Sequence, residues 1–435
     1  MSPAPVSRRG LLLGGSGLAL GGGATGAVLL DRARRAEIPL YSETVAFSAP
    51  DVRHLVPVGR PDTVVPRTRV IEAGPWRSRL VEDEEGWVAG CAAWTRHGDD
   101  EAGLLHSALL DLRALTAGLP VAVAGWSPRW RYAWPRDVAF VASALARLGR
   151  PHEAAAQLVF LQKVQRPDGW FEARYDLETG RAPDDRVAQL DGAGWALWAA
   201  AELGRWAPDE APALLAPVRS LLVLASRRLL ASRDPATGLP PPSSDYWELV
   251  EETLTLGTAA AVLAGLRSAT RALPLVGEMA LADRTARAAD LLGDRLRHLF
   301  APRGYPRLLG GDAPDAAVTF LVSPIGEPEP DLEVLTAVDR AQTAMARPAG
   351  GLAPGASWKN DGISWTPETA LFAAAWAATG YPGKARHLLE WLGRHRTAAG
   401  SFPEKVLHDG RPAAVAPLAW TAATVIIATH ELARR

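Results

Sequence analysis

Residues 371–396 read LFAAAWAATGYPGKARHLLEWLGRHR, and this stretch decides the expected fold. Its first half is apolar on nearly every helical face, whereas its second half carries a polar stripe that includes Lys384, Arg386 and Arg394. A helix that is apolar all round is a buried helix, and a helix with one polar stripe lies at the surface. Gly380 and Pro382 are typical of a helix stop followed by a new start. The stretch therefore predicts a hairpin of an inner helix and an outer helix.

The same unit recurs along the chain. Residues 138–149 precede a more polar helix over 151–164, and residues 195–204 precede another over 209–232; each first helix is expected to end in glycine. The return from each outer helix to the next inner helix is long and rich in Gly, Pro, Trp and acidic residues. Long connections of this kind usually carry function. Repeated hairpins predict an all-α toroid whose long loops gather at one end.

The segments before the repeats differ in character. Residues 1–30 contain Arg8-Arg9 and then an apolar stretch, a pattern typical of a twin-arginine export signal, with Ala24-Thr25-Gly26 as a cleavage site. The apolar stretch over 10–30 also has about the ~20 residues of a membrane span, so an uncleaved anchor is the alternative. Residues 31–82 show no clear period and are expected to form a linker with a few short strands. The catalytic barrel is expected over 83–435.

Composition excludes several classes of function. Lys and Arg number 47 against 48 Asp and Glu, so no net charge draws the chain to nucleic acid or to an anionic membrane. Cys91 is the single cysteine, which excludes an intrachain disulfide and a cysteine metal cluster. No cofactor and no metal is expected. Trp, at 16 residues, outnumbers Phe at 8 and Tyr at 6, and indole faces are well suited to stacking on sugar rings.

Each of five long returns brings a carboxylate close to an aromatic residue. Taken singly, an acid before a helix is most simply a cap that interacts with free amide groups and the helix dipole. Five of them at one end of a ring instead predict a polar pocket with aromatic walls. The five acids are Asp137 after Trp134, Asp191 before Trp195, Glu248 after Trp247, Glu368 after Trp365, and Glu404 after Phe402.

Two of these acids have surroundings that suit acetal hydrolysis, which needs a proton donor and either a nucleophile or a base. Glu248 is predicted to be the acid at the mouth of a buried helix, because Trp247 would desolvate it and Glu251 and Glu252 place like charge nearby. Glu404 is predicted to be the base, ionised beside Lys405 and open to water.

The remaining predicted contacts are to substrate. Arg136 and Asp137 offer a fork of donors and an acceptor, which suits adjacent sugar hydroxyls. Further substrate contacts are expected from Tyr132, Trp134, Trp247 and Trp365, with Asp191 and Glu368 either in the pocket wall or serving as caps.

Four ordered blocks resemble glycoside hydrolase family 15, the glucoamylase family. The segment Trp134-Pro135-Arg136-Asp137 is similar to its W-x-R-D element, and Gln189-Leu190-Asp191 with Gly194 is similar to its Q-x-D-x-x-G block. The D-x-W-E element is matched by residues 245–248, and the P-E-Q segment with its P-L-x-W sequel by residues 403–405 and 417–420. Lys405 departs from the pattern, because glutamine is common there.

The resemblance implies an (α/α)6 barrel, and residues 31–82 are too short for the separate β-sandwich domain of bacterial members. It implies that Glu248 is the general acid, that Glu404 is the general base, and that Arg136 and Asp137 hold the terminal glucosyl unit. The expected activity is inverting release of β-glucose from non-reducing ends of small α-1,4 or α-1,6 glucans. A trehalase-type hydrolase, a phosphorylase or a lyase on the same barrel, and an exported sugar-binding protein without activity, are the alternatives. The expected partner is an oligosaccharide, the N-terminal segment is a candidate membrane tether, and the oligomeric state is open.

Overall fold

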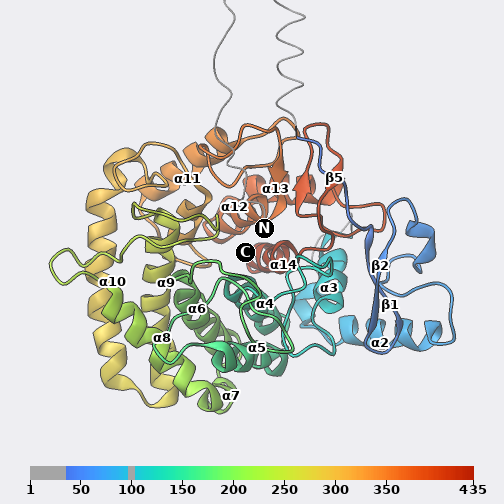
Figure 1. Ribbon diagram of the computed structural model, residues 1–435, viewed down its shortest axis with the longest axis horizontal. Coiled ribbons are helices and arrows are strands. Elements are labelled where there is room, and N and C mark those ends of the chain that lie inside the picture. Colours follow the sequence, from blue (N-terminus) through green and yellow to red (C-terminus); the bar gives the residue numbers. More distant parts are fainter. Residues whose placement is uncertain (1–35, 97–102) are drawn as a thin grey trace, which may run out of the picture.

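The computed structural model describes residues 36–96 and 103–435, so the predicted export signal lies outside the described residues. Within these residues an inner ring forms, in chain order, from α4 (Pro135–Arg147), α6 (Asp191–Trp206), α9 (Leu256–Ala272), η6 (Ala316–Leu321), α12 (Thr366–Ala378) and α14 (Ala419–Ala433). Each member contacts the next, and α14 contacts α4, so the ring is closed (Figure 1). The predicted all-α toroid of six hairpins is confirmed, with one inner member reduced to the short 3-10 helix η6.

The outer layer has one helix for each inner member. These helices are α5 (Pro151–Val164), α8 (Arg219–Ser232), α10 (Met279–Leu299), α11 (Leu332–Met345), α13 (Pro382–Arg394) and α3 (Leu104–Ala114), which packs on α14. The helix expected over 209–232 is interrupted: α7 (Ala211–Leu215) and η3 (Ala216–Val218) precede α8. Pro217 explains the break, because proline has no N–H for a helical hydrogen bond. Short 3-10 turns η4 (Leu273–Val276) and η5 (Ala301–Arg303) flank α10.

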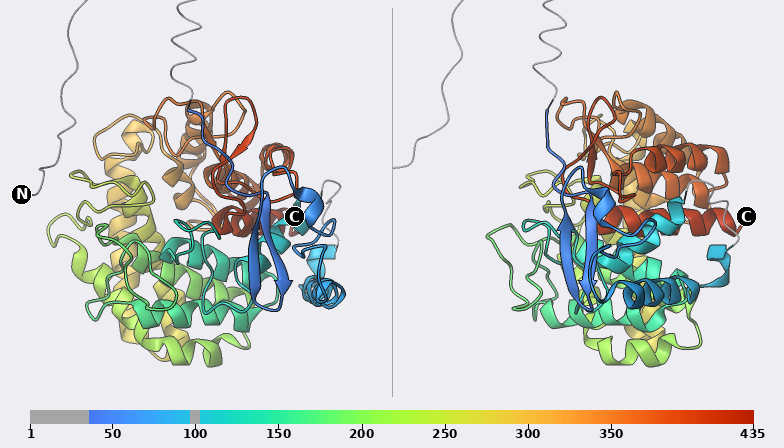
Figure 2. Two further views of the ribbon diagram at one scale, coloured as in Figure 1. Left: turned by 45° about the vertical axis from the view of Figure 1, so that its right-hand side comes forward. Right: turned by 90° about the vertical axis from the view of Figure 1, so that its right-hand side faces the viewer.

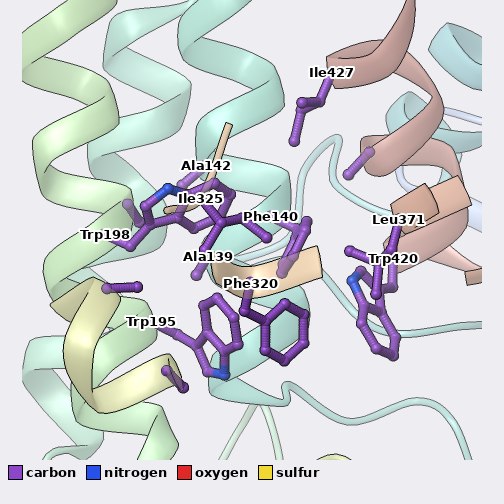
Figure 3. Packing of buried hydrophobic residues seen from close by; sticks show 14 of the residues in the cluster. Ala139, Phe140, Ala142, Trp195, Trp198, Phe320, Ile325, Leu371, Trp420 and Ile427 are labelled. Carbon is purple, nitrogen blue, oxygen red and sulfur yellow. The ribbon is translucent and has the colours of Figure 1, made fainter. Parts of the chain in front are cut away.

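The inner helices are buried as their composition predicts. Every residue of α4 and α12 is buried. Aromatic rings from neighbouring helices meet at the centre, where Phe140 contacts Trp195, Trp198 and Trp420 at centroid distances of 4.9 to 5.7 Å (Figure 3). Such rings bury the large apolar areas that stabilise a core. The closed ring of apolar helices therefore holds the loops at its end in a fixed arrangement.

Glycines permit two features of this packing. Gly149 and Gly380 end α4 and α12 with φ of 71° and 91°, a backbone region that glycine adopts without strain. Gly204 does not end its helix, because α6 continues to Trp206. Gly194 of α6 and Gly265 of α9 face each other, and a Cβ on Gly265 would lie 2.4 Å from the Gly194 Cα. The close approach of these two inner helices therefore requires glycine.

Residues before the barrel pack on its side. Strands β1 (Thr44–Ala49) and β2 (Val52–Val56) form an antiparallel hairpin in which Thr44 lies opposite Val56, and η1 (Pro61–Thr63), α2 (Arg77–Ala89) and η2 (Ala93–Arg96) follow (Figure 2). Arg69, between the hairpin and α2, is buried and pairs with Asp111 of α3 at 2.6 Å. This segment is joined to the barrel by a buried ion pair.

A second small sheet lies at the loop end of the barrel. It orders β3 (Ser364–Trp365), β4 (Lys405–Val406) and β5 (Pro412–Ala413), all antiparallel. Among the described residues, one segment, Leu256–Val276, is long and apolar enough to cross a membrane, and it contains α9, an inner helix of this barrel.

Candidate active site

A cavity of about 290 Å³ opens where the long loops meet the N-terminal ends of α4 and α12. Its volume is at the lower end of the roughly 300–1,000 Å³ usual for ligand pockets. Eight of the ten predicted catalytic and substrate-contacting residues line it, together with residues that the sequence did not single out. The lining comprises Ala124, Arg129, Trp130, Trp134, Arg136, Asp137, Arg174, Arg186, Tyr246, Trp247, Glu248, Pro354, Trp358, Trp365, Pro367, Glu368, Glu404, Leu418 and Trp420.

Arg136 and Asp137 lie in the first turn of α4 and are buried in the pocket wall. The Arg136 Nη2 donates to the Asp137 carboxylate at 3.0 Å, and the guanidinium lies 4.3 Å from the centre of the Trp420 ring. The Nε and Nη1 atoms of Arg136 are buried and have no hydrogen-bond partner among the described residues. Burial raises the pKa of Asp137 to about 6, although the charge of Arg136 opposes the rise. The pocket wall thus holds two unused donors of Arg136 beside the Asp137 carboxylate.

Glu248 reaches the pocket from a loop and not from a helix mouth, which corrects the prediction. The next helix, α9, begins at Leu256, and Glu248 itself has a left-handed backbone with φ of 56°. Asp245 forms the turn: its carbonyl accepts from the Glu248 N–H at 2.8 Å, and its carboxylate is held by both terminal nitrogens of Arg307 at 3.1 Å. The buried Arg307 therefore fixes the loop that carries Glu248.

The immediate neighbours of Glu248 differ from those predicted. The Trp134 indole donates to Oε1 at 2.7 Å, and the Arg186 Nη1 binds Oε2. Glu251 is not a free like charge, because it pairs with Arg307. The ring of Trp247 lies under Arg307 at 3.6 Å and meets Trp358 edge to face. Glu248 is thus an ion-paired carboxylate, held by one indole N–H and one arginine.

Glu404 is clamped by backbone hydrogen bonds just before β4 and far from the start of α14, so it too lies on a loop. Its N–H donates to the Val415 carbonyl at 2.8 Å, and its own carbonyl accepts from the Thr366 N–H at 3.1 Å. The Lys405 Nζ lies 3.2 Å from its carboxylate, as expected. The predicted exposure to water is wrong: the side chain is only 13% exposed, and burial raises the pKa of Glu404, opposed by Lys405.

Glu368 provides a third carboxyl group in the same pocket. It lies in the first turn of α12, and its Oε2 has no hydrogen-bond partner among the described residues. Burial raises the pKa of Glu368 to about 8, and the charges of Glu404 and Asp315 add to that rise. At neutral pH Glu368 is therefore mostly a neutral carboxylic acid, which can donate a hydrogen bond.

Two predicted contact residues do not line the cavity. Asp191, in the first turn of α6, is buried behind the wall and accepts from the Trp195 indole at 3.2 Å; burial raises its pKa to about 7. The Tyr132 ring instead packs against the guanidinium of Arg174, a residue that does line the cavity, at 4.5 Å. The predicted indoles Trp134, Trp247 and Trp365 do line the pocket.

Several lining residues were missed by the sequence reasoning. Trp420 stands in the quoted P-L-x-W block, so its motif was a usable signal, and Trp358 lies in an aromatic and polar loop between repeats. Arg129, Arg174 and Arg186 stand in polar loops with no period that marks them. In residues 36–96 and 103–435 no three His, Cys, Asp or Glu side chains are grouped to hold a metal ion.

The fold of this chain is similar to the folds of solved glycosidases and glucoamylases. A wild-type glycosidase matches with a TM-score of 0.65 and 21% identity over 80% of this chain and 98% of its own. A bacterial glucoamylase complexed with acarbose matches with a TM-score of 0.67 and 16% identity over 82% of this chain and 59% of its own. The chain has a glucoamylase-like six-hairpin fold. A glucoamylase from Saccharomycopsis fibuligera shares the glucoamylase-like barrel with a TM-score of 0.56 and 13% identity over 72% of this chain and 89% of its own.

The comparisons by sequence gave no match. No protein-family model and no curated protein matches the chain. Structural similarity, and not sequence similarity, therefore shows the glucoamylase-like fold.

Proposed function

We propose that this chain is an exo-acting, anomer-inverting α-glucoside hydrolase that releases β-glucose from the non-reducing ends of small α-1,4 or α-1,6 glucans. The observation that carries the proposal is that Glu248 and Glu404, on separate loops, line one pocket. Burial is the main cause that raises the pKa of Glu404, and the charge of Glu248 adds to the rise. Paired carboxyl groups of this kind are what glycoside hydrolysis requires.

In the proposed reaction Glu248 is the acid. It first leaves Arg186 and takes up a proton, then donates that proton to the glycosidic oxygen as the bond from this oxygen to the anomeric carbon breaks. Glu404 is the base: it accepts a proton from a water molecule, whose oxygen forms the new bond on the opposite face of the sugar. Lys405, 3.2 Å away, favours the ionised form of Glu404 that a base needs. The products are β-glucose and the leaving group with its hydroxyl restored.

The rest of the pocket suits a single terminal sugar. In the proposal the unpartnered Nε and Nη1 donors of Arg136 and the Asp137 carboxylate bind adjacent hydroxyl groups of that sugar, and neutral Glu368 supplies a further donor. A cavity of about 290 Å³ holds about one sugar ring, which favours action at a chain end. Buried polar groups without partners give strong selection for the ligand that satisfies them.

The structural neighbours support a hydrolase of sugars. Several are glycosidases, one of them determined with glucose, and the bacterial glucoamylase was determined with acarbose. We also propose that the chain is exported, on the arginine pair and apolar stretch of residues 1–30.

The proposal is tested by supplying maltose, isomaltose, trehalose and dextran to the wild-type protein and to Glu248→Gln and Glu404→Gln. Each substitution is expected to lower kcat by orders of magnitude while the protein still folds, because it removes a proton-transfer group and keeps the shape of the side chain. Glu252→Gln, four residues from Glu248 and exposed, is the matched control with normal activity. Near-normal turnover in either site variant would contradict the catalytic role proposed for the glutamate that it replaces. Cleavage of trehalose alone would instead identify the trehalase-type hydrolase, and sugar binding without turnover a binding protein.

A further inference from the structure

Three arginines line one wall of the pocket and are not needed to hold the terminal sugar. Arg129 comes from the loop before α4, and Arg174 and Arg186 come from the long loop between α5 and α6. Arg174 joins them, because its Nη1 donates to the Arg129 carbonyl at 2.9 Å and its Nη2 pairs with Asp184 at 2.5 Å. The Nε of Arg186 lies 3.4 Å from the same Asp184. We call these three residues the arginine wall.

Arg174 is held rigidly and still has an unused donor. Its guanidinium packs against the rings of Tyr132 at 4.5 Å and Trp134 at 5.1 Å. Its Nε is buried and has no hydrogen-bond partner among the described residues. A planar guanidinium fixed against aromatic rings is preorganised to bind an oxyanion with little loss of side-chain entropy. A buried donor without a partner costs free energy until a ligand satisfies it.

The arginine wall carries three positive charges and has two carboxylate partners in the part of the chain that the structure describes, Asp184 and Glu248. It therefore has an excess of one positive charge even while Glu248 is ionised. In the free protein the Nη1 of Arg186 binds the Glu248 carboxylate, and Asp184 is the other carboxylate that pairs with the wall. The side chain of Arg129 is exposed and has no ion pair among the described residues. When Glu248 takes up the proton that it must donate, Asp184 is the one carboxylate among the described residues that still pairs with the wall, and the excess rises to two positive charges. The wall then lacks a negative partner beside the leaving group.

We propose that the arginine wall binds an anionic group on the leaving group, so that the preferred substrates are α-glucosides whose aglycone carries a carboxylate. This inference rests on the proposed function and specifies its substrate class. The carboxylate takes the place of Glu248 on Arg186, which frees Glu248 to accept a proton from solvent before it donates that proton to the glycosidic oxygen. A neutral aglycone offers no such exchange.

The test uses two pairs of substrates that differ in one group. Maltobionate and maltitol are α-1,4 glucosides with a carboxylate or a CH₂OH at the same carbon, and isomaltobionate and isomaltitol are the α-1,6 pair. For the cleaved linkage, the wild-type kcat/KM is expected to favour the carboxylate by roughly tenfold or more, since hydrogen bonds to charged groups are about twice as strong as neutral ones. Most of the gain is expected in KM, and added salt is expected to reduce it.

Variants distinguish the wall from a general charge effect. Arg129→Gln and Arg186→Gln are expected to bring the carboxylate preference close to one, whereas Arg181→Gln, exposed on the same loop and outside the pocket, leaves it unchanged. Equal rates on the two members of a pair, or a preference that survives both wall variants, would overturn the inference and leave the proposed function standing. If the protein hydrolyses neither neutral nor anionic glucosides, the proposed function is overturned, and the inference with it.

Discussion

Replacement of Glu368 by glutamine isolates the free-energy cost of burying a carboxyl group in the pocket. Glu368 is 2% exposed, and burial raises its pKa from the ordinary 4.5 to about 8. The folded protein therefore binds this proton more tightly than the unfolded chain does. Its contribution to stability is fully present below pH 4.5 and is lost as the pH rises through about 8. Glutamine has nearly the same shape and does not titrate.

The magnitude follows from the pKa. One pKa unit corresponds to about 1.4 kcal/mol, so the change from 4.5 to about 8 sets a ceiling of about 5 kcal/mol on the pH-dependent loss. Between pH 5 and pH 8 the wild-type protein is thus expected to lose several kcal/mol, in the free energy of unfolding, relative to Glu368→Gln. Because the free energy of unfolding of the wild type is compared with that of Glu368→Gln at the same pH, the contributions of other titrating groups largely cancel.

Urea unfolding at pH 5, 6, 7 and 8 measures this difference. Glu390→Gln on the outer helix α13, where the side chain is exposed, is the control and is expected to show no pH-dependent difference from the wild type. The reasoning is refuted if the stability difference between wild type and Glu368→Gln is the same at pH 5 and pH 8. That result would mean that Glu368 ionises in the folded protein as readily as in the unfolded chain.

Three further substitutions test the packing and the sugar subsite. Gly194→Ala is expected to destabilise the fold by about 1–3 kcal/mol, measured by urea unfolding, because its Cβ would lie 2.3 Å from the Ala261 carbonyl oxygen; an unchanged midpoint would contradict the close contact of α6 and α9. Arg147→Met leaves the buried Glu202 and Glu431 without their shared cation and is expected to cost about 3–5 kcal/mol in the same assay, whereas a neutral effect would show that this network contributes nothing. Asp137→Ala is expected to weaken glucose binding as well as turnover, as checked by calorimetry, and unchanged glucose affinity would defeat the subsite.

Much of the barrel could be predicted because its signal is local. An apolar helix such as α4 or α12, followed by glycine with positive φ and then proline, specifies an inner helix and its turn within a few residues. The inner member η6 gave no such signal. Its six residues, Ala316–Leu321, are too few to show a helical period, and Pro324 and Gly326 follow at once. The position of this short helix follows from its tertiary contacts with α9, α11 and α12 and not from a local sequence pattern.

The site was predictable to the extent that its residues stand in compact motifs. Arg136, Asp137, Glu248 and Glu404 do come together, and so does Glu368. The ion pairs of these carboxylates were not predictable, because the partners come from distant parts of the chain. Arg186, which pairs with Glu248, lies 62 residues before it, and Arg307 pairs with Glu251. Likewise Asp191 shares a motif with the pocket yet lies behind its wall.

The proposed roles of Glu248 and Glu404 lead most directly to a prediction about the stereochemistry of the reaction. Proton NMR of the wild-type protein with maltose or isomaltose, recorded in the first minutes before mutarotation, is expected to show the anomeric signal of β-glucose appearing first. In Glu404→Gln this signal is expected to fall with the loss of the base. Initial release of α-glucose, or β-glucose release undiminished in Glu404→Gln, would contradict the assignment of Glu248 and Glu404 as an inverting acid and base.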